Sequence, residues 1–487
     1  MEHFDVLVVG AGISGVGAGY YLQSQSPDRT YAILEGRPQL GGTWDLFRYP
    51  GIRSDSDMYT LGYSFKPWTQ PKAIADGPSI LSYLKETAAQ YGIDRHIRYN
   101  HHVRKAAWST EEARWTVEAD TADGPVTLTC NFLFMCSGYY NYAKGHSPDF
   151  AGVEDFEGRI VHPQFWPEDL DYAGKKVVVI GSGATAVTLV PAMADRTASI
   201  TMLQRSPTYI VARPAEDGMA NWLRGKLPAK VAYGLVRWRN VLFGLFFFNQ
   251  ARKYPAKAKE RILDMVRAEL PDYDIATHFT PRYNPWDQRL CLVPDGDLFA
   301  VIRAGKAEVV TDTIDRFVPG GVRLASGKTL PADIVVTATG LELQLLSDVA
   351  FTVDGEAKEL SQTINYKGMM YSGIPNMASS FGYTNASWTL KADLTCAYVC
   401  RLLNTMRRRG LRQATPHPTA PVGEEPFLDF TSGYVQRSIA KFPRQGDRKP
   451  WRVHQNYLRD LMALKYGSVD DEMDFSNPVP KPVKKAA

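Results

Sequence analysis

The chain has 487 residues, of which 44% are hydrophobic and 11% aromatic, and it carries a formal net charge of +4. This length is enough for two or three domains with sizeable cores, and so small a net charge gives no sign of a nucleic-acid partner. The apolar runs fall short of the roughly 18 residues of a membrane-spanning helix, and the N-terminal stretch does not resemble a signal peptide.

The first predicted element is a strand that ends in a glycine-rich turn. The string DVLVVGAGISGVGAGYYL (residues 5–22) holds Gly10, Gly12 and Gly15 in the spacing GxGxxG, followed by a helical stretch. Such glycines permit a tight turn, close approach of backbone to a pyrophosphate, and close packing of helix on strand. The helix N-terminus offers N–H groups to phosphate, and Ser14 can add a hydroxyl donor. We interpret the turn as a dinucleotide site, the alternative being an ordinary strand–helix turn.

The next strand, YAILE (31–35), supports this interpretation. It ends in Glu35, 20 residues after Gly15. A carboxylate at that place can accept hydrogen bonds from ribose hydroxyls. A surface glutamate with no ligand is the alternative.

A second glycine turn lies further along the chain, in KKVVVIGSGATAVTLVPAMA (175–194). We assign its residues to a second dinucleotide: Gly181, Ser182, Gly183, Ala184, Thr185 and Ala186. The strand that follows ends in Arg205 and Ser206 instead of an acid. A basic side chain there suits the 2′-phosphate of NADP, whereas an acid suits a free ribose. A solvated surface arginine is the alternative.

The two turns together predict an α/β fold with two Rossmann-like domains, one for FAD and one for NADPH. The chain leaves the first domain after NFLFMCSGYYN (131–141) and returns after GKTLPADIVVTATG (327–340), so the second domain is inserted into the first. The predicted divisions are 1–142 (FAD, first part), 143–335 (NADP, with a helical insertion at 217–270), 336–475 (FAD, second part) and 476–487 (a flexible tail).

Between the two turns stands FEGRIVHPQFWP (156–167). Its Phe156, Gly158, His162 and Trp166, followed by Pro167, match the fingerprint FxGxxxHxxxW(P/D) of the Baeyer–Villiger monooxygenases, which are class B flavoprotein monooxygenases. The stretches at 41–65 and 283–299 are similar to the ethionamide-activating branch of that family. Because its prolines lack N–H donors, we expect the segment to be a stiff linker outside both sheets. His162 either helps to couple domain movement to nicotinamide positioning or is a structural histidine.

The resemblance implies an enzyme that contains FAD and uses NADPH and O₂. It would convert ketones to esters or lactones through a C4a-peroxyflavin, and also oxidise thioethers or thioamides at sulfur. A permanent cation would support the anionic peroxide, and the family's active-site arginine matches Arg289. Its carboxylate partner matches Asp55, with Asp57 as the local competitor. The alternative is a flavin-containing monooxygenase acting on nitrogen or sulfur only, whose fingerprint has Tyr or Phe where this chain has Trp166.

Other cofactor contacts are also implied by the resemblance. Gly42, Thr43, Trp44 and Asp45 would line the flavin or its ribityl chain, with a core position as the alternative for Trp44. Arg53 and Ser54 would lie on the nicotinamide side, and Val103 would pair its backbone with adenine. Where the family has lysine before the active-site arginine this chain has Gln288, which leaves more of the 2′-phosphate binding to Arg205 and Ser206.

The rest of the chain is less informative. The helices of 217–270, with VLFGLFFF (241–248), leave three interpretations open: packing on the NADP domain, a substrate-entry or homo-oligomer contact, or weak membrane association. The five cysteines form no paired motif and no metal-ligand spacing, so we expect reduced, structural thiols and a cytoplasmic protein.

Overall fold

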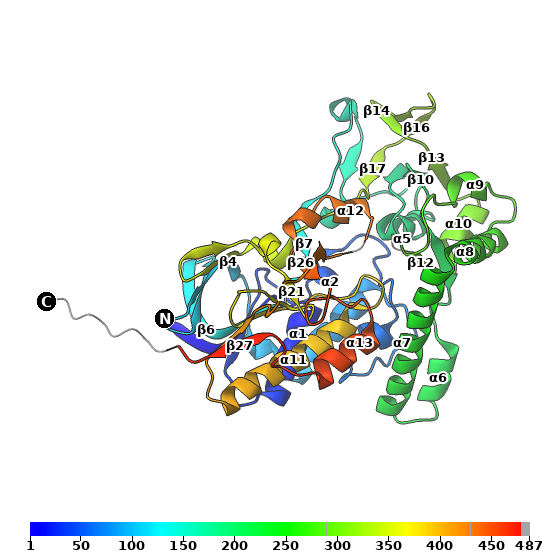
Figure 1. Ribbon diagram of the computed structural model, residues 1–487. Helices are drawn as coiled ribbons and strands as arrows, with labels where there is room; N and C mark the ends of the chain where they lie inside the picture. Colours follow the sequence, from blue (N-terminus) through cyan, green and yellow to red (C-terminus); the bar gives the residue numbers. More distant parts are fainter. Residues whose placement is uncertain (289, 429, 479–487) are drawn as a thin grey trace.

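The computed structural model describes residues 1–288, 290–428 and 430–478. Two large β-sheets organise this part of the chain, and helices pack on each of them (Figure 1). The predicted α/β class with two Rossmann-like units is confirmed, because each sheet contains one of the two glycine turns at the end of a central strand. Position 289, and with it the predicted active-site Arg289, lies outside the described residues.

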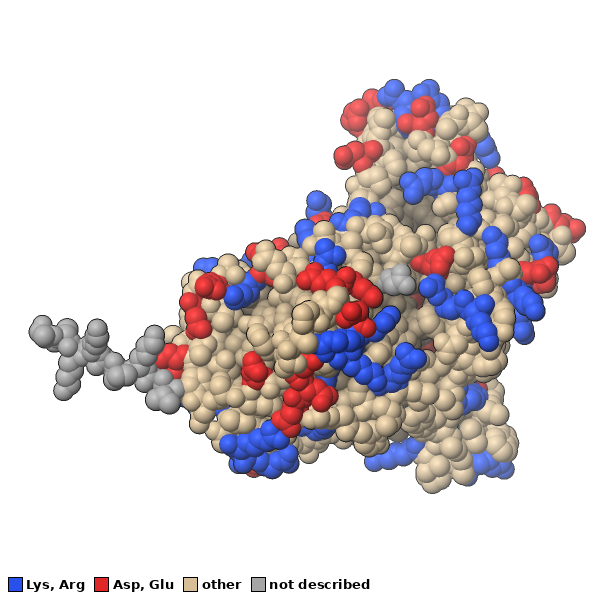
Figure 2. All heavy atoms as spheres, viewed as in Figure 1, with Lys and Arg blue, Asp and Glu red and all other residues tan. Residues whose placement is uncertain are grey.

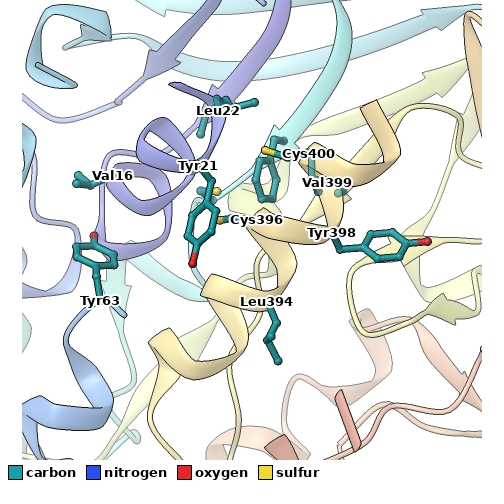
Figure 3. Packing of buried hydrophobic residues seen from close by; sticks show 14 of the residues in the cluster. Val16, Tyr21, Leu22, Tyr63, Leu394, Cys396, Tyr398, Val399 and Cys400 are labelled. Carbon is teal, nitrogen blue, oxygen red and sulfur yellow. The ribbon is translucent and has the colours of Figure 1, made fainter. Parts of the chain in front are cut away.

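The first sheet is mixed, in the order β20-β19-β4-β5-β6-β1-β2-β3, with β23 also paired to β6. Val6 to Val9 of its central strand are buried because α1 and α11 cover one face of the strand, while side chains of β4 and β5 pack on the other. Figure 3 shows α1 and α11 side by side, joined by side chains such as Tyr21 and Cys396. The elements are β1 (Glu2–Val9), α1 (Ile13–Gln25), β2 (Tyr31–Leu34), β3 (Ile97–Arg98), β4 (His102–Ser109), β5 (Arg114–Thr121), β6 (Gly124–Met135), β19 (Ala350–Val353), β20 (Glu356–Lys358), β23 (Met377–Ser379) and α11 (Trp388–Arg408).

The second sheet has five strands, all parallel, in the order β13-β10-β9-β17-β8. Its apolar strands are buried on both faces, as parallel sheets require. The elements are β8 (Arg159–Val161), β9 (Lys176–Ile180), α5 (Ala184–Met193), β10 (Ser199–Gln204), α10 (Asp297–Arg303), β13 (Ala307–Thr311) and β17 (Ile334–Thr337).

The expectation that the fingerprint segment stays outside both sheets is wrong. Its residues 159–161 form β8, the edge strand of the second sheet, which pairs with β17. The strand ends at Val161, before Pro163, so the proline that cannot donate lies beyond the ladder. The linker therefore starts at His162 and not at Phe156.

The two connections between the sheets run beside each other. β7 (Tyr140–Gly145) leads away from the first sheet and pairs antiparallel with β18 (Leu341–Leu343), which leads back. This pairing is what an inserted domain needs, because both crossings must leave the first domain at nearby points. The domain boundaries stay a prediction; β17 continues in the second sheet to Thr337, two residues past the expected boundary at 335.

The helical insertion packs on both domains. It comprises α6 (Gly218–Arg224), α7 (Ala229–Lys253) and α8 (Pro255–Glu269). Tyr233 and Val236 of α7 join the core around α1 and α11, whereas α8 packs in the core of the second sheet. Arg237 of α7 forms a buried ion pair with Asp393 of α11 at 3.2 Å. None of the helices in the described ranges is long and apolar enough to cross a membrane.

Shorter elements complete the described part of the chain. The helices are α2 (Thr43–Leu46), α3 (Met58–Leu61), α4 (Gly77–Gln90), α9 (Ile275–His278), α12 (Gly433–Gln436) and α13 (Tyr457–Asp460). The strands are β11 (Ile210–Arg213), β12 (Cys291–Pro294), β14 (Ile314–Val318), β15 (Gly321–Leu324), β16 (Thr329–Pro331), β21 (Asn365–Tyr366), β22 (Met370–Tyr371), β24 (Gln413–Pro416), β25 (Glu424–Pro426), β26 (Arg444–Gly446) and β27 (Met473–Ser476).

Candidate cofactor and active site

A cavity of about 680 Å³ opens at the carboxyl ends of β1 and β2. Ligands of open α/β sheets bind at such edges, and the volume is typical of sites for drug-sized molecules, which span roughly 300–1,000 Å³. Many of the predicted cofactor residues line this one cavity: Gly10, Gly12, Ser14, Glu35, Gly42, Thr43, Trp44, Ser54, Asp55 and Val103.

The floor of the cavity is backbone that leaves no room for side chains. Gly10 has φ +101°, and a Cβ there would lie 2.7 Å from the Cys136 carbonyl oxygen. Gly42 has φ +57°, and its Cβ would lie 3.1 Å from the Cα of Gly12. Helix α1 begins directly after Gly12 and has no side-chain cap. Its first N–H groups and positive dipole end therefore suit a pyrophosphate, so the residues fit a dinucleotide such as FAD.

Glu35 follows the last residue of β2 and forms part of the cavity wall there. Its Oε2 accepts from the N–H of Ala11 at 2.7 Å, and its Oε1 accepts from the N–H of Arg37 at 2.9 Å. Burial raises the pKa of Glu35, and the two backbone hydrogen bonds act in the opposite direction. The two bonds hold the carboxylate in place at the cavity wall, where the ribose-binding residue was predicted.

Ser14 links the glycine turn to the C-terminal part of the chain. Its Oγ lies 2.8 Å from the indole Nε1 of Trp388, which donates to it, and 3.0 Å from the Ser380 hydroxyl. With two donors directed at the oxygen, the hydroxyl hydrogen of Ser14 is left to point elsewhere. Since Ser14 also lines the cavity, this donor suits a bound phosphate oxygen.

Asp55 and Asp57 have different surroundings. Asp57 caps α3: its Oδ1 accepts from the Thr60 N–H at 3.0 Å and from Asn240 Nδ2 at 2.9 Å. A carboxylate with these partners acts as a helix cap. Asp55, two residues earlier, lines the cavity. The geometry therefore favours Asp55 over Asp57 as the carboxylate that faces a ligand.

Several predicted cofactor residues do not line the cavity. Gly15 packs under the turn, Asp45 is buried in ion pairs with Arg37 (2.5 Å) and Arg48 (3.4 Å), and Arg53 forms an ion pair with Asp297 of α10. The ion pair of Arg53 joins the segment that precedes Asp55 to α10, which packs on the second sheet. Tyr49 makes a similar connection, because its phenol, whose pKa burial raises to about 12, bonds Thr185 of α5.

The second glycine turn is more open than the first. Gly181 has φ +142°, and a Cβ would lie 2.3 Å from the Ala338 carbonyl oxygen, yet Gly183 has nothing within 4 Å of its Cβ position. The Ser182 hydroxyl donates to the carbonyl of Ser206 at 3.1 Å. Arg205 and Ser206 are exposed at the end of β10. The structure brings residues 181–186 and Arg205 together at this turn, away from the lining of the first cavity.

The fingerprint histidine is a structural bridge. His162 Nδ1 accepts from the N–H of Gln164 at 3.2 Å, so the ring proton is on Nε2, which lies 3.3 Å from the Gly340 carbonyl oxygen. The ring also packs on Gly145, where a Cβ would lie 2.1 Å from it. Burial lowers the pKa of His162. A neutral imidazole therefore contacts both crossings, which favours the structural interpretation.

Sequence reasoning missed an aromatic wall. Tyr139, Tyr140 and Tyr142 line the cavity, and the Tyr139 ring stacks on Trp388 with centroids 5.2 Å apart. Trp286 and Leu290, from the loop of the inserted domain, lie on the same cavity. The run YYNY directly after a strand-ending turn was the available signal, because side chains at strand ends face such cavities.

Comparisons with known proteins agree with this site. A family described as flavin-binding monooxygenase-like matches residues 68–223, and the NAD(P)-binding Rossmann-like domain matches residues 8–70. The FAD-containing monooxygenase EthA of Mycobacterium tuberculosis is 59% identical, with 97% of each chain covered. This chain belongs to the FAD-containing monooxygenases. The EthA of Mycolicibacterium smegmatis is 53% identical over 97% of this chain and 96% of its own.

Solved structures share the fold of this monooxygenase. Cyclohexanone monooxygenase with bound ε-caprolactone has a TM-score of 0.77 at 19% identity, covering 98% of this chain and 100% of the other. An oxidised steroid monooxygenase bound to NADP has a TM-score of 0.72 at 25% identity, covering 85% and 88%. The two-domain architecture predicted from the two glycine turns is that of these enzymes.

Proposed function

We propose that this flavin monooxygenase uses NADPH and O₂ to convert ketones to esters or lactones, and that it also oxidises thioethers or thioamides at sulfur. One observation carries the proposal: Asp55, Trp286 and Leu290 line the same cavity as the glycine turn, and the last two come from the segment that also contains position 289. Asp55 thus lies beside the predicted FAD-binding residues, where Arg289 would be its partner. The steroid monooxygenase bound to NADP and the cyclohexanone monooxygenase bound to ε-caprolactone share this fold, which supports the same proposal.

FAD would be held by the first glycine turn and its surroundings. The uncapped start of α1 and the Ser14 hydroxyl would bind the pyrophosphate, and Glu35 would accept from the ribose. Gly42, Thr43 and Trp44 would contact the ribityl chain or the flavin, with Val103 at the adenine end. Bound flavin supplies the reduction of O₂ and the transfer of one oxygen atom to the substrate.

The protein's own groups would control charge and water in the cavity. Arg289 stays protonated in any surroundings, so it would stabilise negative charge that develops on oxygen during the reaction. Asp55 would hold that guanidinium in position. Tyr139, Trp286 and Leu290 give the cavity apolar walls that would exclude water and accept an apolar ketone or thioether.

NADPH would bind at the second glycine turn. The backbone of residues 181–186 would receive the pyrophosphate, and the exposed Arg205, with Ser206, would bind the 2′-phosphate. The contacts of Tyr49 with Thr185, and of Arg53 with Asp297, hold this turn next to the segment that carries Asp55.

The product mixture from a panel of ketones and thioethers tests the proposal. We expect NADPH-dependent esters or lactones from ketones and sulfoxides from thioethers. Sulfoxide formation without any ester would instead favour the flavin-containing monooxygenase that acts only on nitrogen or sulfur. Trp166 argues against that alternative. NADPH oxidation without any oxygenated product would contradict both.

Two variants test the residues. Arg289→Ala should bind FAD and be reduced by NADPH, yet lose ester formation by about 100-fold or more, the loss typical of removing one charge-stabilising group. Asp55→Ala should slow reduction as well as oxygenation. Asp57→Asn is the matched control, since asparagine also caps helices and the variant should keep most activity. Equal losses in Asp55→Ala and Asp57→Asn would contradict the assignment of Asp55.

A further inference from the structure

Helix α7 is apolar on two opposite faces. One face, with Tyr233 and Val236, is buried against the first domain. On the other face, side chains spaced three or four residues apart form a stripe along one side of the helix. They are between 44% and 56% exposed: Val231, Leu235, Trp238, Leu242 and Phe246.

Helix α6 extends the stripe. α6 is tied to α7 through Arg239, which pairs with Asp217 and reaches the Met219 sulfur at 3.1 Å. Met219 and Trp222 of α6 are more than half exposed, as is Phe243 of α7. We call these residues, with the α7 stripe, the α6–α7 patch. Soluble monomers seldom expose so many large apolar side chains on adjacent helices, so the patch calls for a covering surface.

The charged residues of α6, of α7 and of the first turn of α8 are all basic. Residues 218–259 contain no Asp or Glu, although the whole chain has 56 basic and 52 acidic residues. Their basic residues are Arg224, Lys226, Lys230, Arg237, Arg239, Arg252, Lys253, Lys257 and Lys259. Lys226 and Lys230 are exposed at the start of α7, and Lys253 and Lys257 at its other end. Figure 2 shows the region over α6 and α7, at lower right, as largely uncharged with blue at its margins.

We propose that the α6–α7 patch docks this enzyme on an anionic lipid surface. α7 would lie along the bilayer, with its exposed stripe at the acyl boundary and the lysines of both ends on headgroup phosphates. Apolar side chains between basic ends are the pattern of helices that lie in a membrane interface.

Charge argues against a second copy of the chain as the occupant. A two-fold contact through this patch would place the same basic ends close to each other without acidic partners from residues 218–259. An anionic bilayer, in contrast, supplies negative charge along the whole helix.

Docking through α7 would bring the candidate active site close to the bilayer. Val241, on the inner side of α7, packs with Tyr383, and Tyr383 lines the cavity. Asn240 of the same helix bonds Asp57, two residues from Asp55. Apolar compounds dissolved in lipid would therefore be released near the cavity.

Flotation of the FAD-loaded full chain with vesicles tests the proposal. We expect binding to vesicles of phosphatidylcholine mixed with phosphatidylglycerol, and weaker binding at high salt or without the anionic lipid. Leu235→Glu combined with Leu242→Glu should reduce vesicle binding by about tenfold or more, because each buries a charge at the interface. The matched controls Val153→Glu and Met265→Glu alter apolar residues of 37% and 38% exposure outside the patch and should bind as the wild type does.

Retained FAD absorbance shows whether the glutamate variant is folded. If it is not, a second variant keeps the test decisive. Lys226→Gln combined with Lys230→Gln should weaken binding only to the anionic vesicles. Absence of binding to anionic vesicles, or equal binding by the wild type and the Leu235→Glu, Leu242→Glu variant, would overturn the proposal. So would a wild-type dimer in sedimentation velocity that this glutamate variant dissociates, since the patch would then join two copies.

Discussion

The two glycine turns have the same spacing but differ at the third position. In the first turn it is Gly15, where a Cβ would lie 1.8 Å from the Gly10 carbonyl oxygen. In the second turn the position is Ala186, whose methyl group is buried without such a conflict. The first helix therefore lies closer to its strand than the second does. The first turn opens into a cavity of about 680 Å³ with a buried Glu35 in its wall, and the second ends near an exposed Arg205.

This difference suits two cofactors that are used in different ways. A dinucleotide in the first cavity would be surrounded by backbone, by Glu35 and by the aromatic wall, and would leave slowly. One on the second turn would depend on an exposed arginine, so it could exchange in every reaction cycle. We infer that the first turn holds resident FAD and that the second binds NADPH as a co-substrate.

Gly15→Ala should have the largest effect. Its methyl group meets backbone that cannot move independently, so we expect a loss of about 3 kcal/mol or more in the free energy of unfolding, and protein without FAD. Ala186→Gly is the matched control and should lose only about 1 kcal/mol, from added backbone freedom. Thermal unfolding and the ratio of flavin to protein absorbance measure both. Similar losses in the two variants would contradict the difference between the turns.

Glu35→Gln should separate cofactor affinity from stability. Because burial raises the pKa of Glu35, its ionised form is disfavoured in the folded apoprotein, which should become less stable as pH rises from about 4.5 through the folded-state pKa. The amide removes that pH dependence. It also removes a charged acceptor for ribose, which we expect to weaken FAD binding by about 30-fold, or about 2 kcal/mol.

Fluorescence titration of the apoprotein with FAD, and urea unfolding at two pH values, check the prediction for Glu35. Unchanged FAD affinity in the amide variant would show that the carboxylate only supports the N–H groups of Ala11 and Arg37. Glu168→Gln is a suitable control, because that carboxylate is exposed and pairs with the side chain of Arg48 at the surface.

The local parts of the site could be predicted from sequence, because glycine spacing and strand-end residues act within a few positions. Gly10, Gly12, Ser14 and Glu35 were found in this way and do line the cavity. The fold class was also predictable, since each of the two strand–turn–helix units carries the glycine spacing of a dinucleotide-binding domain. That prediction needed no knowledge of distant contacts.

Partners distant in sequence could not be predicted. Arg53 stays predicted on the nicotinamide side, but no local signal indicated its ion pair with Asp297, which lies 244 positions away. Asp45 stays predicted near the flavin, and its ion pairs with Arg37 and Arg48 were not foreseen. The prolines of 163 and 167 suggested a segment outside both sheets, although residues 159–161 pair before the first proline. A polar side chain near a motif gives no sign of which partner it takes, because the partner is chosen by packing.

Arg205→Ala tests whether the second glycine turn binds the 2′-phosphate of NADPH. Loss of one exposed guanidinium from a 2′-phosphate contact should raise the KM for NADPH by about tenfold, or about 1.4 kcal/mol. The KM for NADH, which lacks that phosphate, should hardly change. Steady-state oxidation of both nucleotides measures this, with Arg196→Ala as a control on the same domain whose guanidinium stacks over Tyr172. An equal rise for both nucleotides would remove the 2′-phosphate assignment.

His162→Gln should have the smallest effect, at the crossings that join the two regions. Because burial lowers the pKa of His162, the unfolded chain binds a proton that the folded one does not as pH falls below about 6.5. The wild type should therefore lose stability between pH 7 and pH 5. Glutamine can keep a donor to Gly340 and an acceptor for Gln164 but does not titrate, so it should lose about 1 kcal/mol less over that range.

Urea unfolding at pH 7 and pH 5 measures the His162 effect, and His278→Gln gives the comparison away from the crossings. The pKa of His278 is also lowered by burial, so its variant should show a similar pH dependence. Only the His162 variant should also change the rate at which NADPH reduces the flavin, because His162 alone of the two contacts Gly145 and Gly340. If both variants leave that rate unchanged, the histidine of the fingerprint stabilises the crossings without influencing how NADPH reduces the flavin.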